Sequence, residues 1–389
     1  MENGRATRRR CIWPAGRVAG LDVARALAVF GMLGAHFANI PDDVAASPIR
    51  WLGVVNGRTS ILFAVVAGVS VALLSGRTVP VSGPDLLRAR TRIVVRAAWA
   101  FLIGIGLEAL GTRIDVILGV YAILFVLALP FLRWPPRRLL LAAAVLAVLT
   151  PPVTLLFTLW AQALGADESP LALLMVNGPY PALIWWTFLL VGMAVGRSDL
   201  GSPRVRVRLA GAGVGLAVVG YGAGWLTTRW WGQAVSVQDW IAGGIGPRSW
   251  SLAWLSGAAP HSGTTFEIVG SVGVALVIIA ACLFLADRLP TLTLPLRAVG
   301  SMTLTAYTGQ VIAAAFLADT SVWTWPALIV VTTALATAWR LVLGQGPLER
   351  LLSRTSTAAA ARAVAIKNVV DSRRGGSITK ETSGRSDGV

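Results

Sequence analysis

The sequence predicts an all-α, polytopic membrane protein: a bundle of about ten transmembrane helices with both termini on the cytoplasmic side. Hydrophobic residues occupy 55% of the 389 positions and charged residues only 13%, and the mean hydropathy is +0.70. Soluble domains of average composition do not reach these values. Apolar runs long enough to cross about 30 Å of hydrocarbon recur along the chain, and arginines concentrate in alternate loops between them.

Each expected span is an apolar run, and one helix of about 20 residues crosses the bilayer once. The ten runs cover residues 19–40, 58–75, 93–111, 115–132, 138–162, 179–196, 207–227, 265–286, 297–318 and 323–343. Arginines precede the first run and follow the second, fourth, sixth and eighth, whereas Asp42 and Asp43 follow the first. Because cytoplasmic loops retain Lys and Arg, this alternation places both termini inside.

The positive-inside pattern also explains the net charge of +16, so we expect no nucleic acid partner. Residues 1–18 form a basic cytoplasmic tail. Residues 353–389, rich in Ser, Thr, Gly and charge, are expected to be a disordered cytoplasmic tail. The two cysteines, Cys11 and Cys282, are isolated, so we expect neither a disulfide framework nor a metal site.

Two further segments stand out, a tryptophan-rich loop and a glycine-rich apolar run. The outer loop 228–264 is expected to lie along the headgroups, where tryptophan is favoured; the alternative is a sugar-binding platform. Its tryptophans are Trp230, Trp231, Trp240, Trp250 and Trp254. In the run GAGVGLAVVGYGAG, the pairs Gly211/Gly215 and Gly220/Gly224 have four-residue spacing, which predicts close helix packing rather than a dinucleotide fingerprint.

The first run contains the ionisable groups most indicative of chemistry, because charges inside a bilayer are costly and usually functional. Asp22 and Arg25 are three residues apart and can pair on one helix face. His36 follows about three turns and about 16 Å beyond Arg25, on nearly the same face. A histidine there could act as a general base on a hydroxyl or amine; the alternative is a packing histidine bonded to a neighbouring helix.

Further candidates lie at both ends of the predicted bundle. On the outer side, Asp115 and His261 are candidates for substrate binding, and Glu267 is a candidate catalytic carboxylate. Glu267 also fits a capping box, because Thr264 precedes it by three residues. On the inner side, a group of arginines could hold the phosphates of an anionic cofactor, although the positive-inside rule accounts for most of it. The group comprises Arg77, Arg88, Arg90, Arg92 and Arg96.

The pattern R-x3-LD-x2-R with a later histidine, here Arg17, Asp22, Arg25 and His36, resembles the first helix of membrane acyltransferases that modify surface polysaccharides. Other segments resemble the YeiB-like bacterial membrane proteins and their relatives in the heparan-alpha-glucosaminide N-acetyltransferase group. These segments are residues 56–74, 114–124, 260–276, 299–307 and 346–352. The sequence departs from these families at Ala26, where a glycine is common, and in residues 41–57, which contain no histidine.

The resemblance implies a transmembrane acyltransferase-like domain over residues 19–352, in the bacterial cytoplasmic membrane. It implies a cytoplasmic acyl-coenzyme A as donor and a glycan or other cell-envelope compound as acceptor. The functional pair of the polysaccharide enzymes corresponds to Arg25 and His36. We therefore expect His36 to act as general base or acyl relay and Asp22 and Arg25 to fix the inner end of its helix, with Arg88, Arg90 and Arg92 receiving the cofactor. The alternatives are a transporter or flippase of an anionic or lipid-linked substrate and an inert membrane scaffold.

Overall fold

The structure, a computed structural model, describes residues 16–38, 58–166, 168–231, 252–317 and 321–383. It is all-α, as predicted, and its described residues contain no strand. The first half comprises α2 (Ala19–Phe37), α3 (Arg58–Leu74), α4 (Gly83–Glu108), α5 (Leu118–Leu127) with the turn η2 (Leu129–Phe131), α6 (Pro136–Ala163), α7 (Pro170–Ala172) and η3 (Leu173–Asn177). The second half comprises α8 (Ala182–Gly196), α9 (Pro203–Trp231), η5 (Leu252–Leu255), α11 (Thr265–Arg288), α12 (Leu294–Ser301), α13 (Thr303–Phe316), α14 (Thr324–Val342) and α15 (Pro347–Ser383).

Every one of the ten apolar runs coincides with a helix or a helix pair. In the described part of the chain, five helices are long and apolar enough to cross a membrane: α2, α6, α9, α11 and α14. Helices α7 and η3 together (Pro170–Asn177) are bent by 52° from α8 and make a sixth if the pair forms one broken span. Helix α3, and α5 with η2, are shorter apolar helices. The all-α membrane bundle is therefore confirmed, while the count of ten and the orientation of the termini stay predictions.

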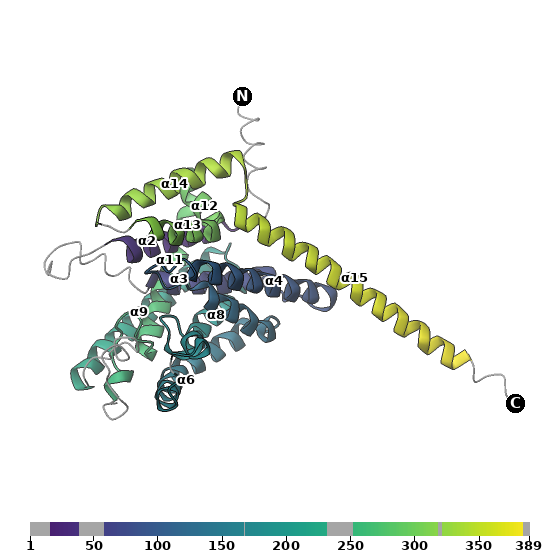
Figure 1. Ribbon diagram of the computed structural model, residues 1–389, viewed down its shortest axis with the longest axis horizontal. Coiled ribbons are helices and arrows are strands. Elements are labelled where there is room, and N and C mark those ends of the chain that lie inside the picture. The colour runs from purple at the N-terminus through teal and green to yellow at the C-terminus, as the bar shows by residue number, and fades with distance from the viewer. Residues whose placement is uncertain (1–15, 39–57, 167, 232–251, 318–320, 384–389) are drawn as a thin grey trace.

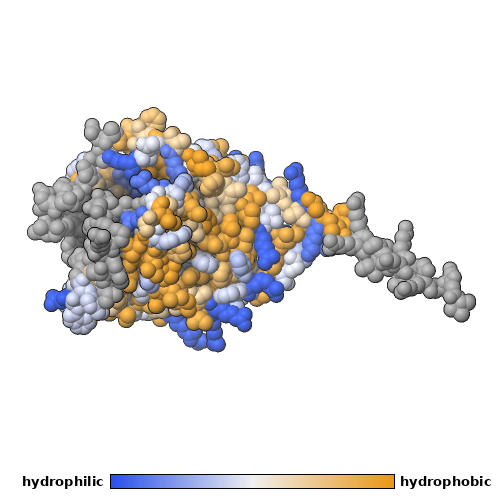
Figure 2. Space-filling model, turned by 60° about the horizontal axis from the view of Figure 1, so that its bottom comes forward, coloured by the Kyte–Doolittle hydropathy of each residue, from blue (hydrophilic) through white to orange (hydrophobic). Residues whose placement is uncertain are grey.

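The surface of the bundle agrees with a lipid environment. Figure 2 shows broad hydrophobic areas on the flank of the molecule, with hydrophilic residues interspersed and at its edges. Large apolar side chains stand exposed on several helices, among them Leu141 and Leu156 of α6, Val218 of α9 and Val330 and Leu335 of α14. A water-soluble protein rarely exposes so much contiguous apolar surface, whereas lipid tails solvate it well.

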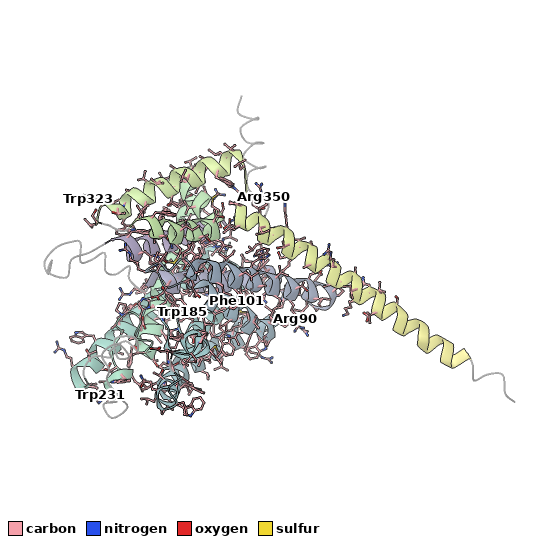
Figure 3. The ribbon with its side chains drawn as sticks, in the orientation of Figure 1. Arg90, Phe101, Trp185, Trp231, Trp323 and Arg350 are labelled. Atoms are coloured by element: carbon pink, nitrogen blue, oxygen red, sulfur yellow. The ribbon has the colours of Figure 1, made fainter. Side chains whose placement is uncertain are left out.

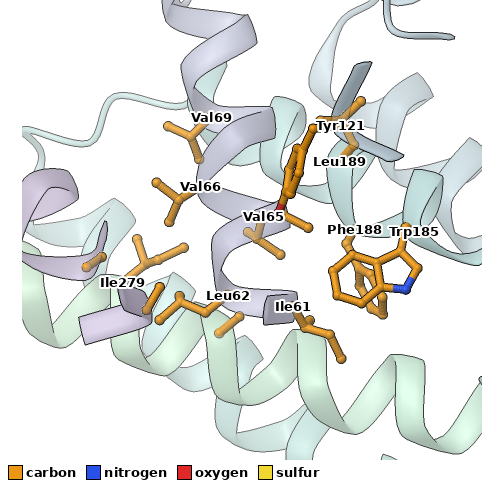
Figure 4. Packing of buried hydrophobic residues seen from close by; sticks show 14 of the residues in the cluster. Ile61, Leu62, Val65, Val66, Val69, Tyr121, Trp185, Phe188, Leu189 and Ile279 are labelled. Atoms are coloured by element: carbon orange, nitrogen blue, oxygen red, sulfur yellow. The ribbon is translucent and has the colours of Figure 1, made fainter. Parts of the chain in front are cut away.

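The bundle is organised around α2 and α3, which lie in the middle and pack against each other and against α11 (Figure 1). Glycines let these helices approach closely. A Cβ on Gly68 of α3 would lie 2.1 Å from the Leu189 carbonyl oxygen of α8, and one on Gly192 of α8 would lie 1.9 Å from the Val65 carbonyl oxygen of α3. Figure 4 shows Val65 and Leu189 at this contact. Small residues at such a crossing are typical of helix association in lipid.

The ninth predicted span, 297–318, is not one helix. It is divided into α12 and α13 at Met302, whose backbone lies at φ −130° and ψ 44°. Just before the break, Gly300 lies against α2, where an added Cβ would come within 1.7 Å of the Asp22 carbonyl oxygen. The backbone thus leaves the helical path where it meets α2, a contact that hydropathy does not encode.

The prediction of a disordered tail from residue 353 is wrong for the residues described there. Helix α15 runs from Pro347 to Ser383, and its first half packs along α4, with Ala360 and Val364 buried. Trp99 of α4 donates an indole hydrogen bond to the Thr355 hydroxyl at 3.0 Å. The sequence STAAAARAVAIKNVV contains many alanines, the best helix former, and its small apolar residues provide the face that meets α4.

The predicted glycine contact is present between α9 and α11, but its register differs. Gly213, Gly220 and Gly224 are buried, whereas Gly211 and Gly215 face open space. A Cβ on Gly220 would lie 2.3 Å from the Gly270 backbone nitrogen of α11. Both members of the second predicted pair are therefore buried, Gly220 against α11 and Gly224 against Ala258, and Gly213, which lay outside both predicted pairs, joins Gly220 on the face that meets α11.

This register predicts different effects for the same substitution at two glycines of α9. Gly220→Ala should lower the free energy of unfolding by about 1–3 kcal/mol, because the methyl group forces two backbones apart. Gly215→Ala, on the open face of the same helix, should leave stability unchanged or raise it slightly, since alanine is the better helix former. Unfolding of the purified protein in mixed micelles would measure both, and equal effects would contradict the observed register.

Candidate active site

The predicted ion pair between Asp22 and Arg25 in α2 is present and lies at the centre of the candidate site. Asp22 is fully buried and accepts hydrogen bonds from Arg17 and from Arg25, the latter at 2.5 Å. Arg25 also donates to the Ser70 hydroxyl of α3 at 2.7 Å. Arg297 of α12 and Arg340 of α14 interact electrostatically with the same carboxylate. Four arginines from three parts of the chain therefore lie around one buried carboxylate, and the cluster is strongly positive.

A cavity of about 400 Å³ adjoins this cluster. Its basic end carries Arg17, Arg25 and Arg96, the last from α4. Its lining also includes the aromatic residues Phe63 of α3 and Tyr121 of α5. Phe63 lies seven residues, about 10 Å along α3, from Ser70, the partner of Arg25, so the aromatic pair occupies a different part of the lining from the arginines. Apolar residues of α3, α4 and α5 line the wall between them, among them Val66, Ala67, Ala100 and Leu118. The cavity can therefore hold an anionic group at one end and an apolar group at the other.

The last helices close the side of this cavity. Gly300, Ser301, Thr303 and Leu304 contribute from α12 and α13, and Gln345, Glu349, Leu352 and Ser353 from α15 and the segment before it. Glu349 accepts hydrogen bonds from the Leu304 and Thr305 amides at 2.8 and 3.1 Å and from the Thr305 hydroxyl at 2.6 Å. A carboxylate at a helix N-terminus satisfies free amides and complements the dipole, so Glu349 fixes α15 to α13 beside the cavity.

The predicted cofactor arginines lie along α4 on the approach to this cavity. Arg88, Arg92 and Arg96 repeat every four residues and so follow one helix face, and Arg96 lies close enough to Arg92 and Arg25 for mutual repulsion. Arg88 is exposed and pairs with Asp85 at 2.6 Å. Arg90 is exposed on another face, and Figure 3 shows it toward one end of the bundle, with Trp231 and Trp323 toward the other. Among these arginines, Arg96 lines the cavity.

His36 lies at the other end of α2 and does not line the cavity. Its Nδ1 atom is buried and has no hydrogen-bond partner among the described residues. The neighbouring charged group is Arg113, which donates to the His36 carbonyl oxygen at 3.5 Å. A carboxylate orienting the imidazole was considered from the sequence, but none pairs with His36 in the part of the chain that the structure describes.

The outer candidates Asp115 and His261 come close enough to interact electrostatically. Burial raises the pKa of Asp115, and the nearby His261 opposes this shift. Burial lowers the pKa of His261, against the opposing effects of a hydrogen bond to the Pro179 carbonyl and of Asp115. The His261 ring also meets the Tyr180 ring edge-on, with centroids 5.9 Å apart. His261 has a φ of 61°, a conformation rare outside glycine and typical of constrained sites.

Glu267 takes part in the cap of α11 and holds the loop of residues 261–263 by hydrogen bonds. The Thr264 hydroxyl accepts from the Glu267 amide at 3.1 Å, as in a capping box. The Glu267 carboxylate accepts from the His261 and Gly263 amides, each at 2.6 Å, and from the Ser262 hydroxyl at 3.3 Å. These contacts are those of the alternative considered from the sequence, and they hold the loop that presents His261.

Several residues of the site gave no individual signal in the sequence. Ser70, Tyr121 and Glu349 fall within segments that resembled the membrane acyltransferases, but a lone serine, tyrosine or glutamate is too common to stand out. Arg96 belonged to the predicted inner arginine group, and only the structure separates it from its neighbours. Among the described residues, no three His, Cys, Asp or Glu side chains are grouped in a way that could hold a metal ion.

Comparison with known protein families gives one result. The family model described as heparan-alpha-glucosaminide N-acetyltransferase, catalytic, matches residues 17–222, which is more than half of the 389 residues. The match begins at Arg17 and includes the α2, α3, α4 and α5 walls of the cavity, whereas the walls from α12, α13 and α15 follow it. A search of curated proteins gave no match.

Proposed function

The chain belongs to the family of the heparan-alpha-glucosaminide N-acetyltransferase catalytic domain, and we propose that it moves an acyl group from cytoplasmic acyl-coenzyme A to a glycan or other cell-envelope acceptor. The membership confirms the relation to transmembrane acyltransferases and makes the chain a multi-pass membrane enzyme of the acetyltransferase kind. The relation to the YeiB-like group, the donor, the acceptor and the bacterial cytoplasmic membrane belong to the proposal.

The observation that carries the proposal is the cavity with a basic and an apolar end. A coenzyme A thioester has negatively charged phosphates at one end and an uncharged acyl group at the other. Arg17, Arg25 and Arg96 supply charge-assisted donors of the kind that bind phosphate, and Asp22 with Ser70 holds Arg25 in place. Arg88 and Arg92 extend the positive charge along α4 and would draw the donor toward the cavity, with Arg90 contributing to the surface potential.

We expect the acceptor to bind at the other end of the bundle. His36 would take the proton from the acceptor hydroxyl or amine as general base, or carry the acyl group; its buried Nδ1 has no hydrogen-bond partner among the described residues. Asp115 and His261 would bind the acceptor. Glu267, predicted as catalytic, would contribute by holding the His261 loop. Since His36 and Arg25 are about 16 Å apart along α2, donor and acceptor would enter from opposite ends.

A binding and turnover assay with labelled acetyl-coenzyme A tests this proposal on the full chain in nanodiscs. Arg25→Ala should weaken binding by about 10-fold or more, the expected loss of charge-assisted hydrogen bonds. His36→Ala should bind the donor within about twofold of wild type but lose turnover, because its side chain lies outside the donor cavity. Arg204→Ala, an exposed arginine of α9, serves as the charge-matched control and should leave both quantities unchanged.

The alternative function is transport. The 52° bend between η3 and α8 and the break between α12 and α13 are features that transporters use to form sites at mid-membrane. If a folded protein binds neither acetyl- nor longer acyl-coenzyme A but moves an anionic or lipid-linked compound across a liposome membrane, the acyl-transfer proposal is excluded.

A further inference from the structure

The donor cavity runs along one face of α3. The lining residues of this helix follow a spacing of three or four, which keeps them on one side of the helix; they are Phe63, Val66, Ala67, Ser70, Leu73 and Leu74. From Leu74 back to Phe63 this face is eleven residues long, about 16 Å. Phe63 is therefore the residue at which the cavity ends along α3.

This end of the cavity points away from the arginine cluster. Arg25 of α2 binds Ser70 of α3. Arg77, beyond the end of α3, donates to the Gly16 carbonyl just before α2. The two helices are therefore antiparallel, and Phe63, seven residues before Ser70, lies toward the C-terminal end of α2, which bears the proposed catalytic histidine. A donor whose phosphates bind the arginines would place its acyl group at Phe63.

Aromatic rings form the wall at this end. The Phe63 ring packs edge-on against the Tyr121 ring of α5, with centroids 5.2 Å apart, and the Tyr121 ring lies 6.1 Å from that of Phe125. All three residues line the cavity, and Figure 4 shows Tyr121 beside α3. The end of the cavity is therefore made of rings that are held by one another.

A hydrogen bond joins two helices just past this wall. The Tyr307 hydroxyl of α13 accepts from the Ile117 amide at 3.2 Å, and both residues are only 2% exposed. The neighbouring residues toward the arginines, Leu304 of α13 and Leu118 of α5, line the cavity, whereas Tyr307 and Ile117 do not. Among the residues that the structure describes, none of the outer candidates lines it either. The cavity is therefore closed at this end.

We propose that Phe63 limits the length of the acyl group, so that the donor is a short-chain acyl-coenzyme A. This inference rests on the proposed function. An acyl group that extends from the arginines along α3 meets the Phe63 ring, which Tyr121 holds in place. A longer chain would have to displace these packed rings or break the Tyr307 hydrogen bond, and overfilling a packed interior is unfavourable. The small residues Ala67 and Ala100 leave room for the donor before that point.

A series of acetyl-, butyryl-, hexanoyl- and octanoyl-coenzyme A tests this inference. Their dissociation constants are measured by calorimetry on the full chain in nanodiscs and corrected with empty nanodiscs. In wild type the affinity should fall by about 10-fold or more within the series, as expected for overfilling. Phe63→Ala removes about six carbon atoms from the closed end. Octanoyl-coenzyme A should therefore bind this variant about 10-fold or more tightly than wild type, while acetyl-coenzyme A binds both within about threefold.

Two further variants control for an effect on the fold. Phe157→Ala removes an exposed ring of α6 outside the cavity and should keep the wild-type limit. Phe63→Leu retains more of the packing and should shift the limit by a smaller step, and thermal unfolding checks that each variant is folded. A wild-type affinity that rises steadily to octanoyl-coenzyme A, or folded Phe63 variants with an unchanged limit, overturns the assignment of Phe63 and leaves the donor proposal intact. A folded wild type that binds none of the four compounds overturns the proposed function and this inference with it.

Discussion

Replacing Arg197 with methionine should lower the free energy of unfolding by about 3–5 kcal/mol, because several buried oxygens lose their charged donor at once and each buried acceptor left unpaired costs about 1–3 kcal/mol. Arg197 is the C-cap residue of α8 and only 3% exposed. One guanidinium nitrogen donates to the Ala72, Ser75 and Arg77 carbonyls at 3.1, 3.2 and 2.8 Å. The other donates to the Ser75 hydroxyl at 2.8 Å and to the Leu132 carbonyl.

The physical reason lies in the helix ends that Arg197 joins. The carbonyls at the C-terminus of α3 have no intrahelical donors, and the negative end of the helix dipole favours a cation there. Methionine matches the length of the side chain but cannot donate. The Ala72 and Ser75 carbonyls would keep their backbone donors, the Arg77 and Val81 amides, whereas the Arg77 and Leu132 carbonyls would lose the Arg197 hydrogen bonds. Arg197→Lys should recover only part of the stability, since an ammonium cannot reproduce the planar fork of donors.

Unfolding of the two Arg197 variants in mixed micelles measures this effect, with Arg204→Ala as the control. Arg204 stands exposed at the start of α9, so its loss should change stability by no more than about 0.5 kcal/mol. A loss for Arg197→Met as small as that of the control would mean that the helix ends are satisfied by other groups.

Hydropathy and charge predicted much of the fold because the bilayer imposes them directly. Each span must be apolar and hydrogen-bonded within itself, so the ten runs coincide with helices. The features that were missed depend on contacts between segments distant in the sequence. The break at Met302 lies where Gly300 meets α2, and α15 stays ordered past residue 353 because it packs on α4. Neither partner can be identified from local composition.

The inner part of the site was predictable to the extent that it lies within one helix. Asp22 and Arg25 pair at three-residue spacing, as helical geometry requires. Arg96 and Glu349 reach the same cavity from α4 and α15, and no periodicity relates those positions. Glu267 shows the reverse case, since the capping-box spacing was visible in the sequence and the structure contains that cap.

The arrangement gives α2 a central place in the proposed mechanism. Its inner end bears the ion pair beside the donor cavity, and its outer end bears His36. Fourteen of its 19 residues are buried, and the Trp325 indole of α14 donates to its Phe30 carbonyl at 2.8 Å. A helix packed against α3, α11, α12 and α14 in this way keeps the donor and acceptor ends at a fixed separation. The positions of the ion pair and of His36 therefore depend on the packing of α2 as well as on its polar residues.

Asp22→Asn should have the second large effect, lowering the free energy of unfolding by about 3–5 kcal/mol, because it removes a fully buried carboxylate and leaves the partly buried arginines around it without a counter-charge. Arg17 and Arg25 both donate to this carboxylate. An asparagine has one acceptor oxygen and turns an NH₂ donor toward the second guanidinium, so it cannot pair with both. Arg297 and Arg340, which also interact with Asp22, would add to the uncompensated charge.

Asp85→Asn is the matched control, since Asp85 forms the same kind of pair with Arg88, also at three-residue spacing and 2.6 Å, but with side chains 64% and 48% exposed. Exposed pairs on a helix contribute about 0.3–0.5 kcal/mol, so this variant should be nearly as stable as wild type. Stability of both variants is measured by unfolding in mixed micelles at neutral pH. Equal losses would show that burial adds nothing to the Asp22 pairs, whereas a large loss confined to Asp22→Asn would identify this carboxylate as the group that lets the positive charges around the cavity coexist.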